Sequence, residues 1–63
     1  MSIPNQYDYL RLALKNVATA AKHSKDRRTR EFRDSRRNAI LFLKKSTELS
    51  LDEAEFAIDQ ALA

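Results

Sequence analysis

The chain has no cysteine, no glycine, one proline and one histidine among its 63 residues. The absence of cysteine excludes disulfides and thiolate metal sites, and His23 alone does not supply the ligands of a zinc site. The absence of glycine argues against the Gly-rich loops that cradle nucleotide phosphates. With a single histidine and no thiol, no pair of nucleophile and base can be proposed. We therefore expect a protein that is not an enzyme and that binds no cofactor, metal or small molecule.

Long apolar runs are absent as well. The longest run, Ala39 to Leu43, is far shorter than the ~20 residues that a membrane-spanning helix needs. The opening sequence, MSIPNQYDYL, lacks the basic start and the uninterrupted apolar stretch of a signal peptide. We expect a cytoplasmic protein that does not associate with membranes.

The scarcity of glycine and proline predicts an all-α chain. Glycine is the usual residue of tight turns and proline breaks helix interiors, yet the only proline is Pro4. We predict one helical domain over residues 1–63, with helices over about 4–22, 25–46 and 51–62 and a long central helix. The third helix has the clearest start, because Ser50 and Glu53 have the spacing of a capping box.

The apolar pattern predicts a small core shared between two chains. In the first helix a stripe that begins at Ile3 continues through Tyr7, Leu10 and Leu14 with helical spacing, and Tyr9 lies at its rim. Chains below ~70–80 residues usually need a disulfide, a metal or a second copy to be stable. Since the first two are excluded, we expect a homodimeric helical bundle. Its predicted shared core consists of Leu10, Leu14, Val17, Phe32, Ile40, Leu43, Ile58 and Leu62.

Charge is separated along the chain. The segment from Lys22 to Arg37 holds eight basic residues against three acidic ones, a net charge of +5, whereas residues 44–63 hold two against five, a net charge of −3. We expect an exposed arginine-rich half-helix to be the partner-binding surface, because the arginine fork pairs well with carboxylates on another protein. The predicted binding residues are Arg27, Arg30, Arg33, Arg36 and Arg37.

Other interpretations of the same segment stay open. The arginines would also suit the phosphates of DNA or RNA, which predicts a steep dependence of binding on salt. Against this, acidic residues are interleaved at salt-bridging spacing, as in Asp26/Arg30 and Arg30/Asp34. The arginines would otherwise form a solvated, ion-paired face, or dock onto the acidic third helix of the same or a second chain. A purely structural oligomer is the weakest alternative.

The sequence also carries a resemblance over its whole length, in the segments MSIPNQYDYLRLALKNV, RRTREFRDSRRNAILFL and SLDEAEFAIDQALA. These segments resemble short early proteins of lambdoid bacteriophages that are encoded between the exonuclease and excisionase genes. The resemblance implies an accessory regulator made early in the bacterial cytoplasm, one that biases the phage between lytic growth and lysogeny by acting on the host. It carries over no binding residue. We expect a regulator that binds host proteins and favours lytic development.

Overall fold

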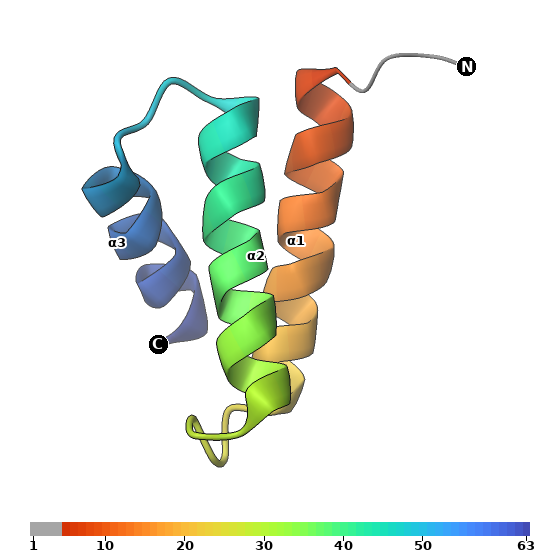
Figure 1. The fold of residues 1–63 in the computed structure, drawn as a ribbon, viewed down its shortest axis with the longest axis vertical. Coiled ribbons are helices and arrows are strands. Elements are labelled where there is room, and N and C mark those ends of the chain that lie inside the picture. The colour runs from red at the N-terminus through yellow and green to blue at the C-terminus, as the bar shows by residue number, and fades with distance from the viewer. Residues whose placement is uncertain (1–4) are drawn as a thin grey trace.

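A computed structural model describes residues 5–63 of the chain (Figure 1). It has three helices, α1 (Gln6–Lys22), α2 (Arg30–Ser46) and α3 (Leu51–Leu62), and no strand within the described residues. The all-α prediction is therefore confirmed. The predicted helix start at Pro4 and the predicted apolar position Ile3 lie outside the described residues.

The helices lie side by side with α2 in the middle. α1 and α2 form an antiparallel pair with the largest interface, α3 packs on the other side of α2, and α3 touches α1 only slightly (Figure 1). The Cα atoms extend over 36 × 26 × 14 Å. This thinness means that the helices form nearly a single layer, so a large share of each helix remains on the surface.

Each helix begins with a side-chain cap. Ser50 and Glu53 form the predicted capping box, in which the Ser50 hydroxyl accepts from the Glu53 amide at 3.2 Å and the Glu53 carboxylate accepts from the Ser50 amide at 3.1 Å. A second box, missed in the sequence, starts α1: the Asn5 side chain accepts from the Asp8 amide at 3.1 Å, and Asp8 accepts from the Asn5 amide at 3.1 Å. These bonds satisfy amides that have no partner within the helix.

The start of the second helix differs from the prediction. α2 begins at Arg30 and not near residue 25, and both α1 and α2 have 17 residues, so the central helix is no longer than the first. The Asp26 carboxylate accepts from the Arg28 amide at 3.0 Å, and the Thr29 hydroxyl donates to the Asp26 carbonyl at 2.9 Å and accepts from the Phe32 amide at 3.3 Å. Such local side-chain bonds compete with helix formation, and they turn residues 23–29 into a connection capped by Thr29.

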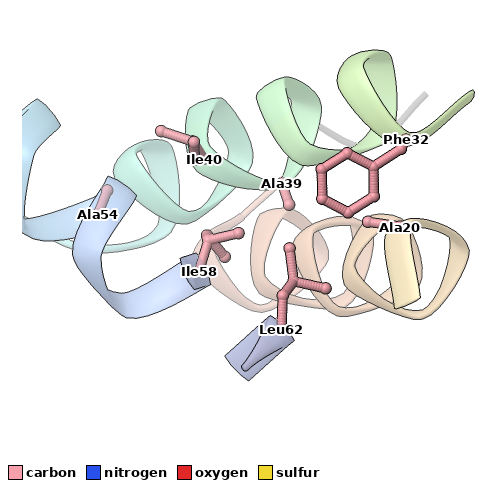
Figure 2. Packing of buried hydrophobic residues seen from close by; sticks show 7 residues of the cluster. All are labelled: Ala20, Phe32, Ala39, Ile40, Ala54, Ile58 and Leu62. Carbon is pink, nitrogen blue, oxygen red and sulfur yellow. The ribbon is translucent and has the colours of Figure 1, made fainter. Parts of the chain in front are cut away.

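The core lies where all three helices meet (Figure 2). Val17, Leu43 and Leu49 pack against it while partly exposed. Four members of the predicted core are buried, and small alanines complete the cluster. The buried cluster consists of Ala20, Phe32, Ala39, Ile40, Ala54, Ile58 and Leu62.

Two α1 residues of the predicted shared core lie on the surface of the single chain: Leu10 is 39% exposed and Leu14 is 61% exposed. α1 instead buries Ala13 and Ala20, so its inner face is rotated by about one residue, roughly 100°, from the predicted stripe. Small buried residues allow two helices to approach closely, and α2 also buries the small residues Ser35 and Ala39. The leucines of α1 are therefore excluded from this interface.

The same rotation exchanges the predicted places of the two tyrosines. Tyr7, predicted on the core stripe, is 71% exposed. Tyr9, predicted at the rim, is partly buried and stacks on Phe42 with ring centroids 6.2 Å apart, while the Lys45 ammonium lies 5.5 Å from the Tyr9 ring centre. Tyr9 precedes Ala13 by four residues and therefore shares the buried face of α1.

Candidate protein-binding surface

Arg36 uses its guanidinium to hold α3 against α2. Its Nε and Nη2 donate to the two carboxylate oxygens of Asp59 at 2.8 and 2.9 Å, and Nη2 also donates to Glu55 at 3.1 Å. The Arg36 side chain is 30% exposed, and those of Glu55 and Asp59 are 47% and 43% exposed. Glu55 and Asp59 are four residues apart on α3, so both carboxylates face the same arginine. The acidic third helix thus docks onto an arginine of its own chain.

This contact shifts the protonation equilibria of both partners. The hydrogen bond from Arg36 lowers the pKa of Asp59 below its ordinary value of 3.8, against an opposing effect of burial. The hydrogen bond to Asp59 raises the pKa of Arg36 above its ordinary value. Both groups are therefore charged at neutral pH, and the Arg36 guanidinium is already occupied by carboxylates.

Arg27 and Arg28 also have partners within the chain. The Arg27 guanidinium lies 5.3 Å from the centre of the Phe32 ring and donates to the Leu62 carbonyl at 3.4 Å. A cation near the last carbonyls of α3 is favourable because that end of a helix is negative. Arg28 pairs with Asp26 at 3.4 Å, and both side chains are largely exposed.

Three of the predicted binding arginines remain without an ion pair among residues 5–63: Arg30, Arg33 and Arg37. Spacings of three and four residues put them on one exposed side of α2, and we call these three residues the arginine row. The predicted pairs Asp26/Arg30 and Arg30/Asp34 do not form. Since no carboxylate holds the arginine row, its guanidinium groups are available to a partner.

The arginine row borders an open groove between α2 and α3, with a volume of about 1260 Å³. Leu41, which follows Arg37 by four residues, lines the groove and is 44% exposed. Leu51 lines it from the start of α3 and is 50% exposed. The α2–α3 groove therefore combines cationic groups on one side with an apolar end.

The sequence prediction identified the cations of this surface and missed its apolar part. The structure brings all five predicted arginines to the α2–α3 groove, but it binds Arg27 and Arg36 to α3. Leu51, in the first turn of α3, is half exposed and supplies part of that apolar surface. The spacing from Arg37 to Leu41 was a usable signal, because residues four apart on a helix share a face.

α1 carries a second exposed surface, formed by Tyr7, Leu10 and Leu14 with spacings of three and four residues. We call it the α1 apolar row. Exposed large apolar residues that cluster on one helix face are more informative than scattered ones, because they mark contacts with other molecules.

Two other features were sought within residues 5–63, a metal-binding cluster and a membrane-spanning helix. These residues contain no group of three or more His, Cys, Asp or Glu side chains placed to hold a metal ion. None of the described helices is long and apolar enough to cross a membrane.

Comparisons with known proteins provide no further identification. No protein-family model, no curated protein and no solved structure matches this chain.

Proposed function

We propose that this protein is a small non-enzymatic accessory regulator of a lambdoid phage, acting in the bacterial cytoplasm. In this proposal it binds a host protein through the arginine row and thereby biases the phage toward lytic development. The phage context rests on the sequence resemblance. One structural observation supports the binding role: Arg30, Arg33 and Arg37 have no carboxylate partner among the described residues and border an open groove.

The composition of the groove favours a protein partner over a nucleic acid. Asp34, Glu55 and Asp59 line it together with the arginines, and their carboxylates would repel phosphates. Leu41 and Leu51 add apolar surface that a phosphate backbone would not use. A second candidate function, a DNA- or RNA-binding regulator, is favoured by Lys44, which extends the cationic side of α2 beyond the arginine row.

We further propose that the chain acts as a homodimer. The buried cluster contains three alanines and four larger apolar residues, which is a small core for 63 residues. The α1 apolar row supports this proposal, because pairing two copies of it across a twofold axis would cover Tyr7, Leu10 and Leu14. The dimer would then leave the α2–α3 groove of each copy available.

The first experiment is a titration with DNA and RNA at two salt concentrations, together with the mass of the protein in solution. A protein-binding regulator should show no salt-sensitive retention on either nucleic acid and should have the mass of a dimer. Submicromolar binding that falls steeply with salt would contradict the proposal and support the nucleic-acid alternative.

Capture from host extract then tests the surface itself. Changing Arg30, Arg33 and Arg37 to Gln should abolish capture of a host protein. A matched control, in which the exposed Arg11, Lys15 and Lys22 of α1 become Gln, removes the same charge and should retain capture. Equal loss in both variants would mean that only net charge matters, and the proposed surface would be wrong.

A further inference from the structure

The charged and apolar residues of the α2–α3 groove are arranged in sequence along its length, and this arrangement restricts which ligands can fit. The arginine row occupies the part near the start of α2, and Leu41 follows at the next helical step. Leu51, from the first turn of α3, adds a second half-exposed apolar side chain to the groove lining. A complementary ligand would therefore carry negative charge along most of its length and an apolar group at one end.

The acidic residues of the groove add a second restriction. Glu55 and Asp59 lie on the α3 side and are held by Arg36, while Asp34 lies on α2 beside the arginine row. A ligand with phosphates spread evenly over its surface would meet these carboxylates as well as the arginines. A ligand with carboxylates on one edge only can place them on the arginine row and avoid α3.

The spacing matches a helix. Arg30, Arg33, Arg37 and Leu41 are separated by three, four and four residues, and they cover about 16 Å along α2. A helix lying along α2, with carboxylates three and four residues apart and a leucine one step further, repeats this pattern. A helix laid in a groove between two others is also a common way for proteins to recognise a peptide segment.

We infer that the α2–α3 groove binds an acidic amphipathic helix of the partner protein, with carboxylates on the arginine row and a large apolar side chain against Leu41 and Leu51. This inference rests on the proposed function and names the chemistry of the partner. Charge complementarity determines the orientation, and covering the two leucines adds affinity that charge alone does not give.

The test uses a labelled synthetic helix of about 14 residues with three glutamates and one leucine in the spacing of the row. One control peptide has the leucine replaced by alanine at unchanged charge, and another has the glutamates replaced by glutamine. A thymidine oligonucleotide of equal charge is the third probe. Fluorescence anisotropy at two salt concentrations measures the dissociation constants.

We expect the leucine peptide to bind about fivefold more tightly than the alanine peptide. It should bind at least about tenfold more tightly than the glutamine peptide. On the protein side, Leu41→Ala should weaken binding of the leucine peptide and leave binding of the alanine peptide unchanged. Leu12→Ala is the matched control, since Leu12 is 39% exposed on α1 and should not affect either peptide. Circular dichroism would confirm that these surface variants are folded.

Equal binding of the leucine and alanine peptides would overturn the inference, because only charge would then be recognised. Tighter binding of the oligonucleotide would overturn it as well. Suppose that no peptide binds, and that the triple Gln variant of the arginine row loses the host protein while the α1 control variant keeps it. The inference then fails while the proposed function stands. If the triple Gln variant binds both the leucine peptide and the host protein as the unaltered chain does, both proposals fail.

Discussion

Replacing Arg36 by methionine should lower the stability of the chain measurably. The change keeps an unbranched side chain at this partly buried position and removes three hydrogen bonds to Asp59 and Glu55, of 2.8, 2.9 and 3.1 Å. These are the only ion pairs between α2 and α3 among residues 5–63. Their loss should loosen α3, which carries the buried Ile58 and Leu62.

The magnitude follows from the exposure of the partners. With 43% and 47% of their side chains exposed, Asp59 and Glu55 regain hydration when Arg36 is removed, so the penalty for a fully buried unpaired charge does not apply. Simple exposed pairs contribute ~0.2–1 kcal/mol. The bidentate contact of Arg36 with Asp59, together with its bond to Glu55, is stronger than a simple pair. We therefore expect the free energy of unfolding to fall by about 1–2 kcal/mol. For a domain of this size that lowers the midpoint of thermal unfolding by roughly 5–15 °C.

Thermal unfolding followed by circular dichroism at a fixed protein concentration measures this loss. Arg33→Met is the matched control, because it removes the same charge from the same helix at a position without an ion pair, and it should change stability by less than about 0.5 kcal/mol. Equal midpoints for the two variants would refute the reasoning, since the geometry of Arg36 would then contribute nothing beyond its charge.

The pH dependence provides an independent check. Because Arg36 lowers the pKa of Asp59 in the folded state, the unfolded chain binds that proton more tightly. The stabilisation from the pair is complete above the ordinary pKa of 3.8 and is lost as the pH falls through the lower folded value. The difference in stability between the unaltered chain and Arg36→Met should therefore shrink in strongly acidic solution. A difference that stays constant down to pH ~2 would contradict this mechanism.

Three further predictions concern other parts of the chain. Ile58→Ala should cost about 2–5 kcal/mol and leave the chain largely unfolded by circular dichroism, because Ile58 is 4% exposed; a native-like melting curve would contradict its place in the core. Ser50→Ala should cost about 1 kcal/mol in thermal unfolding and return the pKa of Glu53, which the bonds to Ser50 lower, toward 4.5 in an NMR titration; an unchanged pKa would exclude the capping box. Leu14→Ala should leave the helical content intact but weaken the proposed dimer in sedimentation equilibrium, and an unchanged dimer would remove the α1 apolar row from the interface.

The sequence predicts where helices form better than it predicts which face of a helix is buried. The all-α architecture follows from the scarcity of glycine and proline, and the start of α3 follows from the Ser50 capping box. Both depend on local chemistry, and both are found in the structure as predicted. The face of α1 could not be obtained this way, because periodicity identifies the stripe of large apolar residues and not the side on which close packing occurs. Here the alanines at 13 and 20 determine that side, and the larger Leu10 and Leu14 remain outside.

The candidate site shows the same division between local and tertiary information. Counting charges identifies an arginine-rich segment, but the pairing of Arg36 with Asp59 joins residues 23 apart in the chain. Spacings along the sequence instead indicated the pairs Asp26/Arg30 and Arg30/Asp34. Only the packing of α3 on α2 distinguishes Arg36, which pairs with α3, from the arginine row, which has no ion pair among the described residues.

The placement of the groove between two helices has a thermodynamic consequence. Any ligand that touches both α2 and α3 binds only chains in which α3 is docked, so its binding free energy adds to the stability of that docked state. A change that weakens docking therefore lowers the affinity by the factor by which it lowers the docked fraction, even at a residue that the ligand never touches. If a ligand binds there, the three bonds of Arg36 contribute to its binding without touching it, and a rise in the melting temperature of the chain reports how fully the groove is occupied.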